Sequence, residues 1–385
     1  MEVDNYFTHV RRLMMVIGIW KVDSPDISIF RKRIYQAYSV CFQLFCYSAA
    51  FSLLAEIPSL VNSDLASAVD NANRFIMYAS HIIIKMIAWQ SKRMVDLLGI
   101  LLQQNQYMQE ASRKDLHIRR LYLRHARFNY KIMFILFGSG TVITVSLPIA
   151  GLMEIYKFMQ SPESVNATEK PLPNRYWYPF DRNKHYVVAL VDQSIRPTLS
   201  CLCASVTSAS LNSLAIFVRA QLKLLQYRFQ HFHQREEEAF AALKRLCVRH
   251  QRLIECTVEF SESLKYIVMI DYTVCSATFA LVILQITAGE DVITSLAVLS
   301  FITLQLIAFS WNCNEIILQS KEMTNALFES HWYDQDQATK VLVHIMMMRC
   351  QRPLSVHIGW MGVMDLEAGM SRLKLGYSYT SIMKN

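Results

Sequence analysis

The sequence is poor in charge, glycine and proline. Only 18% of its 385 residues are charged, and it contains ten glycines and nine prolines. Soluble domains carry about 25% charged residues, so this low charge excludes an ordinary cytosolic domain. The few glycines and prolines argue against a loop-rich all-β protein, and 53% hydrophobic residues exclude a disordered chain. The apolar residues therefore need a place other than a soluble core.

The sequence also lacks the motifs of catalysis and metal binding. It contains no Gly-rich phosphate loop, no Gly-x-Ser-x-Gly, no His-Glu-x-x-His and no His/Cys cluster at metal spacing. None of its nine cysteines falls in a predicted external loop, which excludes an external disulfide framework. We interpret the cysteines as small packing residues. The sequence thus predicts no enzyme, no cofactor and no metal site.

What the sequence does contain is long apolar blocks. A membrane-spanning helix needs roughly 20 apolar residues, and five blocks here carry no Asp, Glu, Lys or Arg. A sixth block contains Arg74 and Lys85, which we place near its ends, where long basic side chains can reach the membrane surface. The sequence predicts an all-α polytopic membrane protein with seven spans, at about 34–55, 69–90, 132–153, 190–217, 266–288, 292–313 and 356–383.

The basic residues predict the orientation of these spans. The connections on one side of the membrane carry 28 Lys and Arg residues, against 6 on the other. The positive-inside rule then places the N-terminus in the cytoplasm and the C-terminus outside. Asn166 begins a glycosylation sequon in the long loop placed outside. The net charge of +8 is therefore interpreted as topology and not as a nucleic-acid-binding surface.

Three shorter segments lie on the predicted cytoplasmic side. The apolar stretch 13–20 is interpreted as an amphipathic helix in the membrane plane rather than a signal peptide. Segments 219–265 and 314–355 have apolar residues at helical spacing, and we expect them to extend from the spans into the cytosol as an anchor domain. Their apolar stripes fit either a bundle within the chain or an interface between subunits.

Ionisable residues inside the spans are candidates for function. Asp192 and Arg196 lie four residues apart, so they form either a structural bridge or the polar corner of a ligand cavity. We expect Asp271, near the inner end of its span, to reach water or Lys265, and His81 to be a packing residue.

The last span contains charged residues on two opposed faces, because its acidic and basic residues form two pairs seven positions apart. A lone helix in lipid would not tolerate this charge, so the span is expected to be buried among other helices or to line an aqueous path. The alternative is a terminal helix with an amphipathic end. The charged residues are Asp365, Glu367, Arg372 and Lys374.

Four local signatures stand out along the chain, near residues 178, 249, 331 and 375. The inverted topology and the missing Asp-Arg-Tyr and Asn-Pro-x-x-Tyr motifs differ from G-protein-coupled receptors. The signatures are Tyr178-Pro179-Phe180-Asp181, Arg249-His250-Gln251, His331-Trp332-Tyr333 with Arg349-Cys350-Gln351-Arg352-Pro353, and Leu375-Gly376-Tyr377-Ser378-Tyr379-Thr380. Together with the predicted external C-terminus, these signatures resemble those of the insect odorant receptors.

The resemblance implies an odorant-gated, non-selective cation channel in the plasma membrane of sensory neurons. Such channels are tetramers, usually containing the olfactory co-receptor (Orco), which has a long insertion before span five. The 47-residue link 219–265 lacks that insertion, so the chain resembles a ligand-tuning subunit. Alternatives are a gustatory-receptor-type channel, a G-protein-coupled receptor or a small-solute transporter.

The resemblance also assigns residues to the pore and to the odorant pocket. The last span corresponds to the pore helix, in which Ile382 matches the hydrophobic gate and Ser378 and Tyr379 lie one turn below it. The pocket would lie in the outer half of the membrane and hold a small volatile molecule mostly by apolar contact. Its candidate residues are Phe75, Tyr78, Thr144, Leu147, Gly151, Ile195, Leu199, Ser300, Phe301 and Leu304, with Asp192 and Arg196 at the rim.

Overall fold

The structure of the chain is a computed structural model that describes all residues except 1–5, 22–27, 64, 161–171, 173, 233–238, 289–291 and 385. The described residues are helical throughout, apart from loops and one isolated β-bridge. The helices are α1 (Thr8–Val16), α2 (Ile29–Ser63), α3 (Leu65–Tyr78), the π-helical turn η1 (Ala79–Ile84), α4 (Lys85–Trp89), α5 (Lys92–Lys114), α6 (Leu116–Gln160), α7 (Tyr186–Gln230), α8 (Ala239–Ala288), α9 (Val292–Phe328), the short 3₁₀ helix η4 (Trp332–Asp334), α10 (Gln337–Cys350) and α11 (Leu366–Lys384).

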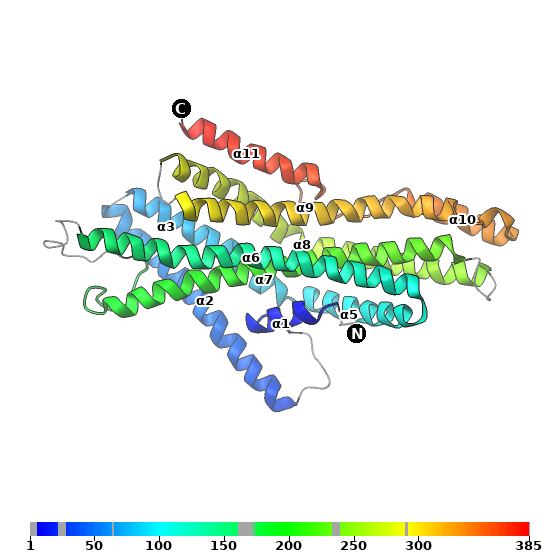
Figure 1. Cartoon of the computed structure of the whole chain (residues 1–385), viewed down its shortest axis with the longest axis horizontal. Coiled ribbons are helices and arrows are strands. Elements are labelled where there is room, and N and C mark those ends of the chain that lie inside the picture. The colour runs from blue at the N-terminus through cyan, green and yellow to red at the C-terminus, as the bar shows by residue number, and fades with distance from the viewer. Residues whose placement is uncertain are drawn as a thin grey trace.

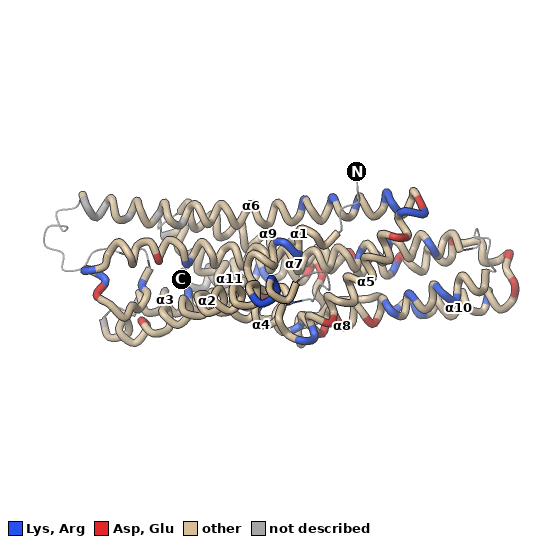
Figure 2. The backbone as a smooth tube through the Cα atoms, turned by 90° about the horizontal axis from the view of Figure 1, so that it is seen from below, with Lys and Arg blue, Asp and Glu red and all other residues tan. Residues whose placement is uncertain are grey.

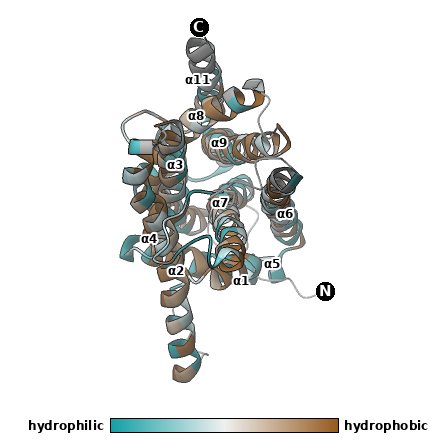
Figure 3. Ribbon diagram, turned by 90° about the vertical axis from the view of Figure 1, so that its left-hand side faces the viewer, coloured by the Kyte–Doolittle hydropathy of each residue, from teal (hydrophilic) through white to brown (hydrophobic). Residues whose placement is uncertain are grey.

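The helices form one elongated bundle. Figure 1 shows α6, α7 and α9 running side by side along its long axis, with α10 at one end and the α6–α7 connection at the other. Seen along that axis, α7 lies inside the bundle, whereas α11 and the start of α2 lie at opposite edges (Figure 3). The fold is thus a central helix with a surrounding layer.

Helix α7 can occupy the centre because its side chains are small. Serines, threonines and alanines recur between residues 203 and 215, and all of them are buried. The hydroxyls of Ser205, Ser210 and Ser213 donate to the carbonyl four residues earlier, so these hydroxyls need no partner on another helix. Small residues of this kind let neighbouring helices approach closely within a membrane.

Five helices of the described chain are long and apolar enough to cross a membrane. They cover Ile29–Asn62, Leu116–Met153, Tyr186–Gln230, Ala239–Thr287 and Val292–Asp334. The second predicted span falls on the rod made of α3, η1 and α4, and the seventh falls on α11. Both are shorter and more polar than the other five.

The seventh span was predicted too long. Residues 356–365 form a loop, in which His357 and Val363 make an antiparallel bridge. Gly359 and Gly362 have φ angles of +52° and +114°, which only glycine adopts without strain. The helix therefore begins ten residues later than the apolar pattern suggested.

The N-terminal segment packs against the bundle. Val10 and Met14 of α1 are fully buried, and Tyr6 just before it donates its backbone N–H to the Tyr122 hydroxyl at 2.9 Å. The Tyr6 hydroxyl donates to the Ser213 carbonyl of α7 at 3.2 Å. The apolar face of α1 is thus covered by protein, which the amphipathic pattern alone did not reveal.

The segments predicted to be cytoplasmic are helical extensions of long helices. Helices α7, α8 and α9 continue without a break beyond the apolar blocks, and α10 folds back beside α9. Lys and Arg gather over the half of the bundle that contains α5 and α10 (Figure 2). Leu243, Leu246 and Leu253 are buried within the chain, whereas Val341 and Ile345 of α10 are each 50% exposed.

Candidate functional site

A polar cluster lies at the end of the bundle that holds the α6–α7 connection. Arg196 Nε is 2.6 Å from Asp192 Oδ2, so the predicted pair within α7 forms. The Tyr178 hydroxyl donates to Asp192 at 2.8 Å, and Arg196 donates to the Ser52 hydroxyl of α2 at 3.3 Å. Burial and the adjacent Asp192 carboxylate raise the pKa of Tyr178. The pair is therefore a structural bridge that also fastens the connection to α2.

The same connection closes over the helix ends at other points. Arg182 is 3.0 Å from Glu56 of α2, which is only 5% exposed. Tyr176 is buried, and the Arg196 guanidinium carbon lies 5.5 Å from the centre of its ring. These contacts make residues 174–185 of the α6–α7 connection a cap over α2 and α7. Asn166 lies outside the described residues.

The candidate pocket residues divide into two groups beside α7. Phe301 of α9 is buried in a small cluster with Ile143 and Ala204, and Thr144 follows Ile143 on α6. Gly151 is buried and Leu199 half-buried, whereas Ile195, Ser300 and Leu304 are exposed. Nothing is described of the Leu147 side chain.

The second group surrounds Tyr78 at the end of α3. Tyr78 is 8% exposed, and Phe75, one turn earlier, is half-buried. Cys46 of α2 and Cys203 of α7 are fully buried and belong to the same hydrophobic cluster as Tyr78. These residues join three helices at one level of the bundle, and the sequence carried no signal for that junction.

A buried ion pair joins α4 to α8. Lys85 Nζ is 2.7 Å from Asp271 Oδ2, and His81 Nδ1 is 3.3 Å from Asp271 Oδ1. The Lys85 side chain is only 1% exposed, so it does not reach the membrane surface as predicted. Lys265 pairs with Glu262 instead of Asp271. The prediction for Lys85 and the Lys265 alternative for Asp271 were wrong because each considered a single helix, whereas the Lys85–Asp271 pair joins two. The other alternative for Asp271, contact with water, stays a prediction.

A small cavity of about 50 Å³ adjoins this pair. Asp271, Tyr272 and Cys275 line it from α8, and Asn212 and Gln305 line it from α7 and α9. A space of this size holds roughly three or four water molecules. Within the described part of the chain, Gln305 Nε2 is buried without a hydrogen-bond partner. The cavity wall is thus mainly apolar and carries a few polar groups, among them Asp271, Asn212 and Gln305.

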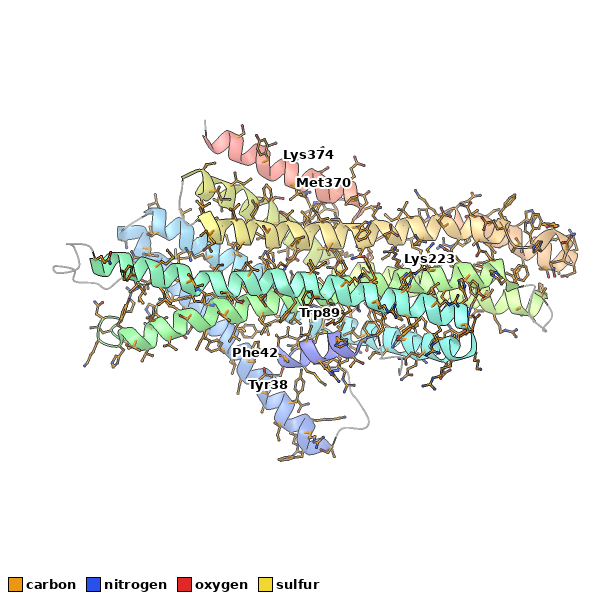
Figure 4. All side chains as sticks on the ribbon, in the orientation of Figure 1. Tyr38, Phe42, Trp89, Lys223, Met370 and Lys374 are labelled. Atoms are coloured by element: carbon orange, nitrogen blue, oxygen red, sulfur yellow. The ribbon has the colours of Figure 1, made fainter. Side chains whose placement is uncertain are left out.

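Helix α11 leaves one face uncovered by the rest of the chain. Tyr377 is 68% exposed and Met370 44% exposed. Figure 4 labels Met370 and Lys374 on this helix at the edge of the bundle, far from the internal Trp89. The uncovered face carries hydroxyl, amine and apolar groups in alternation. It comprises Met370, Ser371, Lys374, Tyr377, Ser378 and Ser381; the side chains of Tyr379 and Ile382 are not described.

The opposite face of α11 packs tightly against α8 and α9. A Cβ added to Gly369 would lie 2.4 Å from Ser310 Oγ, and one added to Gly376 would lie 2.7 Å from the Phe279 ring. The Arg372 guanidinium carbon lies 4.6 Å from the centre of the Tyr272 ring. Glycine thus allows close helix contact, and an arginine fixes the rotation of α11.

Asp365 has a different role from the one predicted. It lies just before α11, where its carboxylate accepts the Ala368 backbone N–H at 2.7 Å. A side chain in this position satisfies a backbone donor that the first turn leaves unpaired. Asp365 is therefore a helix cap and not a charge inside a membrane span.

The signature Arg249-His250-Gln251 lies on the part of α8 that extends beyond its apolar block, on the side predicted to be cytoplasmic. The Arg249 guanidinium carbon is 3.4 Å from the centre of the Tyr107 ring on α5. His250 is 2% exposed beside Phe229 of α7, and burial lowers its pKa to about 4. It is therefore uncharged at neutral pH and acts as a packing residue that fastens α8 to α7.

Comparison with known sequences gives a consistent assignment. Residues 64–377 match the family model described as 7tm Odorant receptor. Odorant receptor 10 of Aedes albopictus is 26% identical over 183 residues, covering 45% of this chain and 48% of the relative. Odorant receptor 30a of Drosophila melanogaster is 22% identical over 228 residues, covering 56% and 60%. The chain spans about half the length of these relatives.

Comparison with solved structures confirms the predicted helical membrane fold. The insect olfactory receptor OR5 from Machilis hrabei, in complex with eugenol, matches with a TM-score of 0.78 at 14% identity. The match covers 98% of this chain and 99% of that one. A second structure of the same receptor matches with a TM-score of 0.79. Because the family model covers most of the chain, the protein belongs to the 7tm odorant receptor family, whose members are multi-pass membrane proteins and not enzymes.

Proposed function

We propose that the chain is a subunit of an odorant-gated, non-selective cation channel whose pore is lined by α11. The uncovered face of α11 carries this proposal. An exposed stripe that includes Lys374 and Ser378 would be unfavourable in lipid, but it suits a water-filled path between subunits. The opposite face, packed on α8 and α9, holds the helix to its own chain.

The proposed ligand is a small volatile molecule bound beside α7. Phe301, Tyr78 and the apolar groups beside them offer contact area to a ligand. The hydroxyls of Thr144 and Tyr78 offer hydrogen bonds, and the two kinds of contact together fix the orientation of a small ligand. Asp192 and Arg196 satisfy each other at the rim, so we expect them to shape the pocket's outer wall. The similar Machilis hrabei receptor was solved in complex with eugenol, a phenol of this size class.

The proposed partner is the olfactory co-receptor, in a heterotetramer within the plasma membrane. Val341, Ile345 and Met348 of α10 are at least half exposed and lie on the cytoplasmic part of the bundle. Exposed apolar side chains grouped on one helix are typical of a contact surface between proteins. The apolar stripe of α8 is buried within the chain itself, so α10 is the surface that we propose for assembly.

The first experiment measures current from cells that express the chain with the co-receptor. We expect at least one member of a panel of volatile esters, alcohols and phenols, including eugenol, to evoke a cation current without added nucleotides. The physical reason is that ligand binding favours an open arrangement of the helices over a closed one. Cells that express the co-receptor alone serve as the control.

Surface delivery is checked in the same cells with an antibody against a C-terminal tag. Staining of intact cells is expected, because the basic residues predict an external C-terminus. A tag that stains only after permeabilisation, or the lack of any evoked current from a surface-exposed chain, would contradict the proposed function.

Replacing Ile382 with serine is expected to raise the resting current. A hydrophobic constriction closes a pore by excluding water, and a hydroxyl at that point lets water remain. Whole-cell current without odorant, divided by the amount of chain at the surface, measures the effect. Ile293→Ser is the matched control, because Ile293 is also an isoleucine, is 79% exposed at the start of α9 and lies outside α11. Unchanged resting and evoked currents in Ile382→Ser would remove Ile382 from the gate.

A further inference from the structure

The π-helical turn η1 interrupts the rod of α3 and α4. It runs from Ala79 to Ile84, with Tyr78 directly before it and Lys85 directly after it. A π turn contains one residue more than the α-helical turn that it replaces, and such turns are rare and frequently found at functional sites. Conversion to a regular α-helix would rotate Lys85 by about 100° relative to Tyr78, because an α-helix has 3.6 residues per turn.

The ion pair with Asp271 holds the turn in its π form. Both Lys85, at the end of the turn, and His81, inside it, point to the same carboxylate on α8. Rotation of either residue by about 100° would remove it from Asp271. A buried charge that loses its partner is strongly destabilised, so the contacts favour the π form as long as Asp271 is paired with both.

Asp271 also borders a mainly apolar cavity that contains a few polar groups. It lines the small cavity together with Asn212 and Gln305, whose Nε2 is buried without a hydrogen-bond partner in the described chain. Amide N–H groups and the roughly three or four waters that fit there can solvate a carboxylate. Asp271 is therefore paired with the π turn in this structure, and the amide groups at the cavity wall offer the alternative surroundings that a two-state element requires.

The two ends of this element reach the proposed ligand site and the proposed pore. Tyr78, a candidate pocket residue, is the last residue before the turn. On α8, Tyr272 follows Asp271 and lies under the Arg372 guanidinium of α11. A change in the turn thus has a short path to α11, through two neighbouring residues of α8.

We propose that the π turn and its Lys85–Asp271 pair form a two-state switch that couples ligand binding beside Tyr78 to the position of α11. In the resting state the turn is π-helical and Asp271 is paired with Lys85 and His81. Ligand binding favours the α-helical form, in which Asp271 turns to the cavity and Arg372 moves with Tyr272. This inference rests on the proposed channel function.

The experiment uses the double variant Lys85→Met with Asp271→Leu, expressed with the co-receptor. Replacing a buried ion pair by apolar residues of similar volume usually preserves folding, so the variant keeps the packing but loses the contact that favours the π form. We expect a higher resting current and an odorant EC50 lowered about tenfold, the shift that ~1.4 kcal/mol of lost bias produces. Current is divided by surface amount, and the agonist is the strongest member of the odorant panel.

A second variant and a matched control make the result specific. Deletion of Ile83 removes the extra residue of the π turn and is expected to shift resting current and EC50 in the same direction. The control is Arg93→Met with Glu259→Leu, because that pair also joins a neighbouring helix to α8 but is 53% and 35% exposed. We expect it to leave the EC50 unchanged.

The outcomes separate this inference from the proposed function. A wild-type chain that gives no current with any odorant contradicts the channel function itself. A wild-type response combined with an unchanged EC50 and resting current in both the double variant and the deletion variant overturns the switch, while the channel function stands. An equal shift in the Arg93–Glu259 control also overturns it, since the effect would then not be specific to the π turn.

Discussion

Replacing Asp271 with alanine is expected to reduce the amount of chain at the cell surface by at least about tenfold, because removing one partner of a buried ion pair costs about 3–5 kcal/mol. The Lys85 ammonium is 1% exposed and 2.7 Å from the lost carboxylate. His81, the other neighbour of Asp271, cannot replace a negative charge. Surface biotinylation, expressed as the ratio of surface to total chain, measures the loss.

Two comparisons test the cause of this loss. The double variant Lys85→Met with Asp271→Leu removes both charges and is expected to recover most of the surface amount, so the two substitutions should be strongly non-additive. Glu259→Ala breaks the more exposed pair with Arg93 and is expected to change the ratio little, because exposed pairs contribute about 0–1 kcal/mol. An Asp271→Ala chain that reaches the surface at the wild-type level would show that the pair does not stabilise the fold.

Replacing Gly369 with alanine is expected to abolish most of the odorant-evoked current without a comparable loss of surface amount. The new Cβ would lie 2.4 Å from Ser310 Oγ and 2.8 Å from Ser310 Cβ, so α11 has to move away from α9. Such a displacement of a packed helix costs about 1–3 kcal/mol. It also changes the position of the face that we propose for the pore.

The partner residue offers a rescue that isolates the contact. Ser310→Gly removes the atoms that would clash, so the double variant Gly369→Ala with Ser310→Gly is expected to regain evoked current. Gly99→Ala is the control, because an added Cβ there meets no atom within 4 Å. Wild-type currents in Gly369→Ala, or a failure of the glycine at position 310 to restore current in a chain that reaches the surface, would contradict close packing of α11 on α9.

Much of the architecture followed from local sequence properties. Apolar blocks long enough to cross a membrane predicted the long helices, because burial of backbone and side chains in lipid depends on an uninterrupted run. The Asp192–Arg196 pair was also predictable, since residues four apart share a helix face. The signatures near residues 178, 249, 331 and 375 identified the family, which residues 64–377 confirm.

Other features were decided by contacts between helices. The start of α11 depended on two glycines with positive φ angles and on Asp365 as a cap, neither of which a hydropathy pattern detects. The burial of α1 depended on packing against the bundle, where Tyr6 makes hydrogen bonds to α6 and α7. An amphipathic pattern states that one face needs cover, but not whether lipid or protein provides it.

The sequence by itself determined that this protein is a helical membrane receptor of the odorant family, because apolar length, basic asymmetry and short signatures are properties of neighbouring residues. Only the tertiary structure decided that Lys85 pairs with Asp271 and that one face of α11 stays uncovered. The strength of a buried charge pair depends on the distance between two atoms. That distance is set by how α4 and α8 pack, which no local pattern in either helix records.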